Sequence, residues 1–76
     1  MFFWRELWQW TGTSWVHLSG RLVSLLEDQD AELKAQAKAS RRWVLERIFI
    51  WDGSSWNLDH DWMYPPDGGS PIFTSY

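Results

Sequence analysis

The chain opens with the two-residue alternation that is typical of a β-strand. From residue 2 to residue 10 the even positions are aromatic except for Glu6, while the odd positions are mixed. A period of two places these two sets of side chains on opposite faces of a strand. Residues 11–14 then predict a turn and residues 15–18 a return strand, so this segment is expected to form a β-hairpin.

The same hairpin pattern returns 41 positions later in the chain (51 − 10). Trp10-Thr-Gly-Thr-Ser-Trp15 reappears as Trp51-Asp-Gly-Ser-Ser-Trp56, which makes an internal repeat of roughly fifteen residues. We therefore expect hairpins at residues 2–18 and 43–60. A competing interpretation continues a helix through Ile48 to Trp51, but the density of β-branched and aromatic residues favours a strand.

Between the two hairpins the apolar period changes from two to three and four. Ser19 and Gly20 interrupt the strand pattern, and apolar residues then recur at helical spacing from Leu22 to Ala37. Acidic residues lie in the first half of this segment and basic residues near its end, which is the distribution that a helix dipole favours. The sequence therefore predicts one amphipathic helix between the hairpins, with the charged residues on its solvated face.

The end of the chain has a different composition. Three prolines and two adjacent glycines between residues 65 and 71 exclude a regular helix or a central strand there. We expect residues 1–62 to form a single α+β domain, with two β-hairpins joined by one amphipathic helix in the order ββαββ. Residues 63–76 are expected to form an irregular, Pro/Gly-rich extended tail.

Opposite charges at equivalent places of the repeat predict how the hairpins lie. Glu6 aligns with Arg47, and Arg5 aligns with Glu46. If the first and third strands lie parallel in that register, each pair becomes a cross-strand neighbour, whereas an antiparallel pairing of Glu6 with Arg47 sets Arg5 opposite Ile48. The parallel arrangement predicts the sheet order 2-1-3-4, with the helix as the crossover connection.

Such a sheet has two faces of different character. We define the aromatic face by Phe2, Trp4, Trp8, Trp10, Trp15, Trp43, Leu45, Phe49, Trp51 and Trp56. The aliphatic face consists of Phe3, Leu7, Val16, Leu18, Val44, Ile48 and Ile50. One helix covers only one face, and its Leu/Ala stripe matches the aliphatic face, which leaves the aromatic face in need of a cover.

Composition excludes several classes of protein. Eight tryptophans among 76 residues give more aromatic surface than one small core needs. The sequence has no cysteine, so we expect no disulfide, no thiolate metal site and no cofactor. The net charge of −3 argues against nucleic-acid binding, which clustered basic residues drive. No segment approaches the about 18 apolar residues of a membrane span, and Arg5 and Glu6 interrupt the opening apolar run before it could serve as a secretion signal.

No cluster of residues carries a specific catalytic signature. Asp59, His60 and Asp61 would suit a small metal-dependent hydrolase, but strand alternation places only the two aspartates on one face. His17 lies in an apolar hairpin, without an acidic or nucleophilic partner at strand spacing. The sequence also has no Gly-rich phosphate loop and no nucleophile elbow. We therefore expect neither an enzyme nor a metal site.

The Trp51-Asp-Gly-Ser-Ser-Trp56 hairpin resembles turn units found in bacteriophage virion and tail modules and in some carbohydrate-binding domains. The resemblance implies a phage virion component, or a phage-type inhibitor of a host complex, located in the host-cell cytoplasm or in the virion. Together with the surplus of aromatic residues it favours a non-enzymatic protein-binding or assembly module, as an oligomer or a complex subunit. A carbohydrate-binding module is the alternative, because exposed tryptophans stack on sugar rings, although few polar groups lie between them.

We expect the partner-binding site to combine aromatic residues of the sheet with those of the tail. Its residues are Trp8, Trp10, Trp15, Trp51, Trp56, Trp62, Tyr64 and Phe73. Two roles for the tail stay open: it folds over the aromatic face as the lid of a closed monomer, or it extends as an arm that grips a partner protein or a second copy. The polar stretch of residues 67–71 favours the arm.

Overall fold

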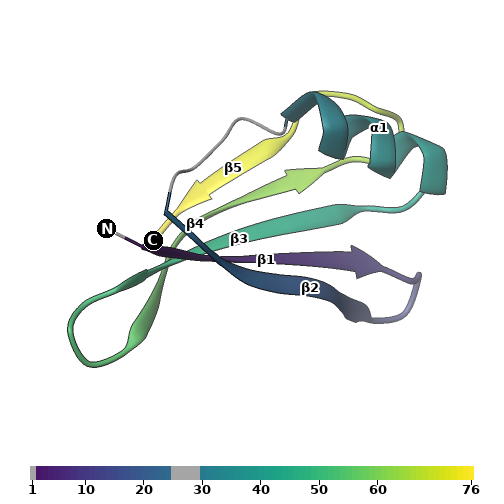
Figure 1. Cartoon of the computed structure of the whole chain (residues 1–76). Coiled ribbons are helices and arrows are strands. Elements are labelled where there is room, and N and C mark those ends of the chain that lie inside the picture. The colour runs from purple at the N-terminus through teal and green to yellow at the C-terminus, as the bar shows by residue number, and fades with distance from the viewer. Residues whose placement is uncertain (1, 25–29) are drawn as a thin grey trace.

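The computed structural model describes residues 2–24 and 30–76, which form one antiparallel sheet with a helix against one end (Figure 1). The elements are β1 (Phe3–Trp10), β2 (Trp15–Val23), α1 (Asp30–Ser40), β3 (Val44–Trp51), β4 (Trp56–Tyr64) and β5 (Ile72–Ser75). The strand order is β2-β1-β3-β4-β5. The helix described here has eleven residues, and it lacks the length and the apolar character needed to cross a membrane.

The predicted ββαββ fold class is wrong. The central strands β1 and β3 run antiparallel, with Glu6 opposite Arg47 and Arg5 opposite Ile48. Because β2 and β3 are both antiparallel to β1, they run in the same direction, and the connection that contains the helix is the crossover that joins two such strands. The chain therefore crosses the length of the sheet before β3 begins, and a parallel centre does not form.

The tail is also not irregular throughout, because β5 pairs with β4 as a fifth strand. The Pro/Gly-rich stretch is the turn that allows this pairing. The Gly68 N–H donates to the Pro65 carbonyl at 3.2 Å, and the Asp67 carboxylate accepts the Gly69 N–H at 2.8 Å. Pro71 stands just before the strand, where its missing N–H removes no bond from the sheet.

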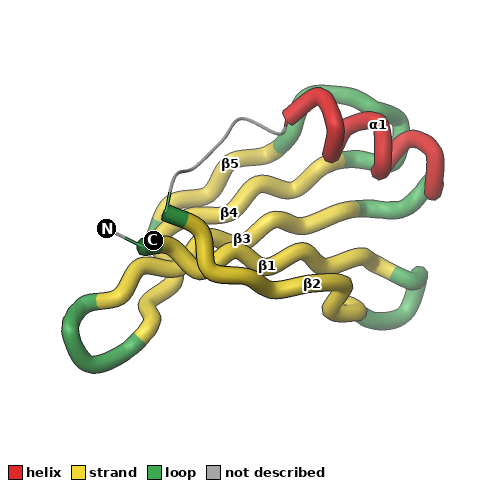
Figure 2. The backbone as a smooth tube through the Cα atoms, viewed as in Figure 1, coloured by secondary structure: helices red, strands yellow, loops and turns green. Residues whose placement is uncertain are grey.

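The internal repeat extends over all four long strands. A shift of 41 positions maps residues 3–23 onto residues 44–64 (3 + 41 and 23 + 41), which are the bounds of the two hairpins. Glu6 pairs with Arg47 (6 + 41) in an antiparallel ladder, so an approximate two-fold axis normal to the sheet passes between these two residues. The two hairpin turns consequently lie at opposite ends of the sheet (Figure 2). The copies are therefore related by rotation and not by translation.

The irregularities of the strands follow the same symmetry. Each hairpin contains one register shift, which leaves Leu18 as the extra residue in β2 and Asp59 (18 + 41) as the extra residue in β4. Such bulges increase the local twist of a strand pair. The repeat therefore includes the twist of each hairpin as well as its turn.

The predicted start of the helix at Leu22 is wrong, because Leu22 and Val23 belong to β2. α1 starts at Asp30, and β2 continues to Val23, so Gly20 does not break the strand. Gly20 fits there because the ring of Trp4 occupies the space of its missing side chain: a Cβ atom would lie 2.8 Å from Trp4 Cζ2. Residues 25–29, which the prediction includes in the helix, lie outside the described residues.

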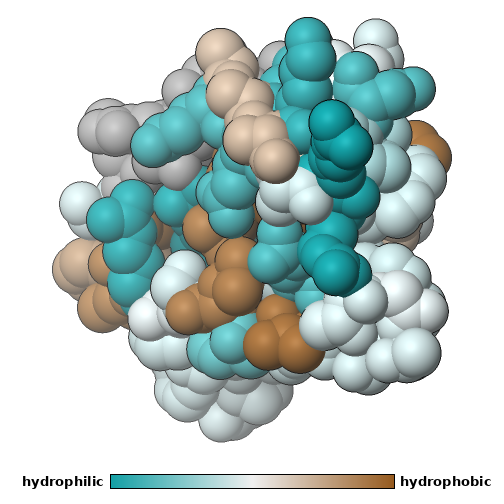
Figure 3. All heavy atoms as spheres, turned by 90° about the vertical axis from the view of Figure 1, so that its right-hand side faces the viewer, coloured by the Kyte–Doolittle hydropathy of each residue, from teal (hydrophilic) through white to brown (hydrophobic). Residues whose placement is uncertain are grey.

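The core lies between the helix and one end of the aliphatic face. Its buried members are Leu33, Ala37, Val44 and Tyr64, with Leu7 and Trp62 packed against them. The helix is therefore on the face that its Leu/Ala stripe predicts, and the side of the molecule that carries it is mostly hydrophilic, with a few weakly hydrophobic atoms between the polar ones (Figure 3). Within the part of the chain that the structure describes, no helix covers the aromatic face.

Candidate functional site

The eight residues predicted to bind a partner divide between the two faces of the sheet. The strand registers place Trp8, Trp10, Trp15, Trp51 and Trp56 on the aromatic face. The same registers place Trp62, Tyr64 and Phe73 on the aliphatic face, in rows with Glu46 and Val44.

The three residues on the aliphatic face have structural contacts. Tyr64 is only 3% exposed, and Trp62 packs beside it and against Phe73, with the ring centroids of Trp62 and Phe73 4.6 Å apart. These three side chains point away from the aromatic face, so they do not form a lid over it. Because β5 is hydrogen-bonded to β4, the tail is not a free arm in this structure either.

A pair of tryptophans closes each hairpin on the aromatic face. The rings of Trp10 and Trp15 stand edge to face with their centroids 5.4 Å apart. Trp51 and Trp56 repeat this arrangement at 5.5 Å, and the angle between the ring planes is 61° in both pairs. Such aromatic pairs contribute about 0.5–1.5 kcal/mol beyond the area that they bury. The face therefore has a fixed aromatic pair at each end.

The two turns hold these pairs with different chemistry. In the first turn Thr11 Oγ1 accepts the N–H of Ser14 at 3.2 Å. In the second turn Asp52 Oδ1 accepts the N–H groups of Ser54 and Ser55, both at 2.8 Å, and these bonds hold the pKa of the carboxyl well below its ordinary value. The glycine that follows has a φ of 103° in the first turn and 104° in the second, which a residue with a Cβ adopts only with strain.

One carboxylate organises the centre of the aromatic face. Glu6 accepts hydrogen bonds from the indole N–H of Trp4 at 3.0 Å and of Trp8 at 3.2 Å. The ring of Trp8 also packs on His17, with centroids 4.9 Å apart, and the ring of Trp4 lies against Gly20. Glu6 thereby fixes the orientation of two large rings.

A row of charged residues crosses the aromatic face at the level of the two-fold axis. Glu6 on β1, Arg47 on β3 and Asp61 on β4 are cross-strand neighbours. Asp61 is buried and accepts a hydrogen bond from the Tyr76 hydroxyl at 2.8 Å, which raises the pKa of Tyr76. The Nε–H of Arg47 is buried and has no hydrogen-bond partner among the described residues. The row therefore contains a cation with unused donor capacity.

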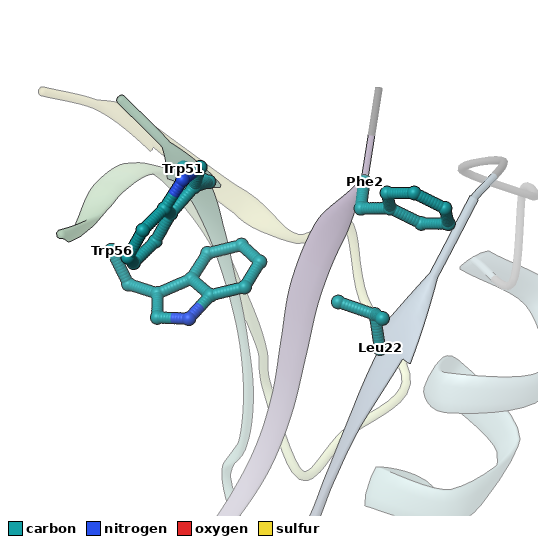
Figure 4. A pocket seen from close by; sticks show the side chains of 4 residues that line it. All are labelled: Phe2, Leu22, Trp51 and Trp56. Atoms are coloured by element: carbon teal, nitrogen blue, oxygen red, sulfur yellow. The ribbon is translucent and has the colours of Figure 1, made fainter. Parts of the chain in front are cut away.

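An apolar groove of about 510 Å³ opens at the end of the aromatic face where β1 begins. Trp51 and Trp56 form one wall, Phe2 and Leu22 form the other, and β1 runs between them (Figure 4). All four side chains are exposed, from 39% for Trp56 to 57% for Phe2. The sequence interpretation assigns Leu22 to the helix and so misses one wall. Alternation continued from Trp15 across Gly20 would still place Leu22 on the other face, because it is the bulge at Leu18 that brings Leu22 to the aromatic face.

Only two of the three candidate catalytic residues come together. His60 Nδ1 lies 2.8 Å from Asp59 Oδ2, and the His60 ring packs on Phe73 at the aliphatic face. Asp61 lies on the aromatic face, where it is bonded to Tyr76. Within residues 2–24 and 30–76, no group of three His, Cys, Asp or Glu side chains could hold a metal ion.

Comparisons with protein-family models, with curated proteins and with solved structures give no match to this chain. We therefore infer the function from the aromatic face and its groove.

Proposed function

We propose that the protein is a binding and assembly module that docks through its aromatic face onto another protein surface. The observation that supports this most is the groove, in which four large apolar side chains on one face are all exposed. Tryptophan is among the residue types that most often dominate the binding energy of an interface. In this role the chain is one component of a larger complex, as the resemblance of its second hairpin to phage modules implies.

The polar groups near the groove favour a protein over a sugar as the ligand. A carbohydrate site needs hydrogen-bonding groups beside its stacking rings. In the second hairpin the Asn57 amide donates to Asp52 at 2.6 Å, and the Asp52 carboxylate binds the turn, so these groups are already used within the chain. The groove residues themselves supply only indole N–H groups. A carbohydrate-binding module is therefore the weaker candidate.

A peptide-display selection on the purified protein tests the proposal. We expect enrichment of peptides with bulky apolar side chains, and their affinity should fall about tenfold or more in Trp51→Ala. Phe73→Ala is the matched control, because Phe73 and Trp51 are both 50% exposed but lie on opposite faces. Near-UV circular dichroism checks that both variants fold.

Two results would contradict the proposal. Selected peptides that bind Trp51→Ala as tightly as the wild type would show that the groove is not the site. Binding on a glycan array that is lost in Trp51→Ala, with no peptide enriched, would establish the carbohydrate alternative.

A further inference from the structure

We propose that the surface which covers the aromatic face is that of a second copy of this chain. This inference rests on the proposed function and names its partner. Two five-stranded sheets pack aromatic face to aromatic face about a two-fold axis that runs along the strands, between β1 and β3. The product is a β-sandwich whose core consists of the two aromatic faces.

Of the two possible two-fold axes in the sheet plane, the row formed by Glu6 and Arg47 favours the one along the strands. Rotation about an axis along the strands places β1 of one copy over β3 of the other, so Glu6 meets the partner's Arg47 and Arg47 meets the partner's Glu6. Rotation about the axis that lies in the sheet plane, perpendicular to the strands, would instead place Glu6 over the partner's Glu6 and Arg47 over the partner's Arg47. Like charges in an interface cost free energy, whereas the first arrangement sets the Glu6 carboxylate of each copy against the Arg47 guanidinium group of the other copy.

The same rotation fills the groove of each copy with side chains of the other. Phe3 pairs with Ile50 in the β1–β3 register, so Phe2 and Trp51 are the next cross-strand neighbours along these two strands. Trp51 therefore meets the partner's Phe2, and Trp56 stands over the end of the partner's β2, where Leu22 lies. The indole wall of one groove packs on the Phe2 and Leu22 wall of the other, which is the self-complementarity that a two-fold interface requires.

The size of the face also suits a stable pair. Five strands about 4.8 Å apart and about eight residues long present on the order of 600 Å² in projection, at about 3.3 Å per residue. The exposed rings add to this area, and a standard interface buries about 800 Å² on each partner. A second copy also supplies the packed layer that the aromatic face lacks.

Sedimentation analysis of the full chain tests the inference. We expect a species of twice the 9.1 kDa chain mass at high concentration, which dissociates on dilution. Trp51→Ala should raise the dissociation constant of the dimer about tenfold or more, while Phe73→Ala should leave it unchanged. A wild-type chain that remains monomeric at every concentration overturns the inference.

A mixing experiment tests the axis. Glu6→Arg makes both central positions basic and Arg47→Glu makes both acidic, so each variant alone should dimerise more weakly than the wild type. In an equimolar mixture every basic position meets an acidic one, and heterodimers should form with nearly wild-type affinity. If each variant alone dimerises as well as the wild type, or if the mixture restores nothing, the proposed packing is overturned.

Glu6→Arg removes the acceptor of two indole N–H groups, so near-UV circular dichroism must first show that this variant folds. If it does not fold, Arg47→Glu is compared with Arg47→Met. Because a carboxylate at position 47 would face the partner's Glu6, Arg47→Glu should weaken the dimer more than Arg47→Met does. Equal effects overturn the packing.

Failure of this inference can be told apart from failure of the proposed function. A monomer that still binds selected peptides through the groove overturns the second copy and leaves the function in place. A monomer that selects no peptide overturns both. A dimer that tolerates Trp51→Ala but dissociates with Phe73→Ala uses the aliphatic face, and it also overturns both.

Discussion

The two hairpins of this sheet share a backbone and differ in the side chains that they place on it. Both have an edge-to-face tryptophan pair, a turn glycine with positive φ, and a bulge at the equivalent residue. These are the features that set the shape of a hairpin. They differ in the acceptor of the turn, Thr11 or Asp52, and in the charges beside the two-fold axis. The tryptophan pair, the turn glycine and the bulge are therefore what both hairpins need for their shape, whereas the turn acceptor and the charges beside the axis can differ.

The residues beside the axis show what a repeat within one chain allows. In two identical hairpins related by a true two-fold axis, a charged residue next to the axis would meet its own copy. Here the copies are not identical, so Arg5 meets Glu46 on the aliphatic face, and Glu6 lies opposite Arg47 on the aromatic face. The first pair forms a buried ion pair, whereas the Glu6 carboxylate binds two indoles.

Removing one member of the buried pair should have the largest effect on stability. Arg5 and Glu46 are each only 8% exposed, so Arg5→Leu leaves a buried carboxylate without this cation. We expect the free energy of unfolding to fall by roughly 3–5 kcal/mol, measured by urea denaturation with tryptophan fluorescence. Arg47→Met, measured at a concentration at which the chain is monomeric, should cost less, because Arg47 is less buried than Arg5.

The double variant Arg5→Leu/Glu46→Leu is the control for this prediction. It removes both buried charges, so it should recover most of the stability that Arg5→Leu loses. If the double variant is as unstable as the sum of its single variants, the two residues are not coupled. Equal losses from Arg5→Leu and Arg47→Met would remove the distinction between the two faces.

The same two pairs show how far the sequence could predict the fold. The alternation of residues 2–10 and 43–51 indicates strands, and the charge complementarity indicates that Glu6 and Arg47 are neighbours. A pair of residues at equivalent positions of a repeat is adjacent in a parallel arrangement, and a pair beside the axis is also adjacent in an arrangement rotated by two-fold symmetry. Charge complementarity therefore could not decide the direction of β3.

The sequence indicates other parts of the structure more weakly. Taken from the sequence alone, Gly20 indicates the end of a strand. In the structure it lies within β2, because the ring of Trp4, which is distant in sequence, fills the space beside it. The fifth strand has only four residues and follows a proline, so local propensity could not indicate it. For the site, the aromatic face follows from the period of two, whereas the groove depends on Leu22, which the helical interpretation removes from the sheet.

Gly20→Ala should have the next largest effect, because this position differs between the halves. Its counterpart in the second hairpin is Asp61 (20 + 41), which carries a side chain, whereas a Cβ atom at Gly20 would lie 2.8 Å from Trp4 Cζ2 and 3.3 Å from His17 Nε2. Moving the indole would break its bond to Glu6. We expect a loss of about 1–3 kcal/mol in urea denaturation, with a changed near-UV circular dichroism spectrum.

The neighbouring Ser19→Ala is the control for Gly20→Ala. Ser19 is exposed and points to the aliphatic face, so its truncation should change the free energy of unfolding by less than about 0.5 kcal/mol. A Gly20→Ala variant that is as stable as Ser19→Ala would show that the Trp4 ring moves without cost.

The smallest effect concerns the two turns, and pH separates them. Asp52 has a pKa below its ordinary value of 3.8 because the N–H groups of Ser54 and Ser55 and the Asn57 amide bind its charged form. A lowered pKa in the folded state means that this stabilisation is fully present above about pH 4 and is lost as the pH falls through the folded-state pKa. The first turn uses the Thr11 hydroxyl, which does not titrate in this range.

Proton chemical shifts of the turn amides, followed from about pH 6 to below about pH 1, measure this difference, because the carboxyl takes up its proton only far below pH 3.8. The Ser54 and Ser55 amides should move as Asp52 takes up its proton, while the Ser14 amide stays constant. Asp52→Asn keeps an acceptor oxygen without the charge, so it should abolish the movement. Thr11→Asp should make the first turn respond as well, because the two turns have the same backbone. If Ser54 and Ser14 respond alike in the wild type, or if Asp52→Asn still titrates, the carboxylate is not what distinguishes the two hairpins.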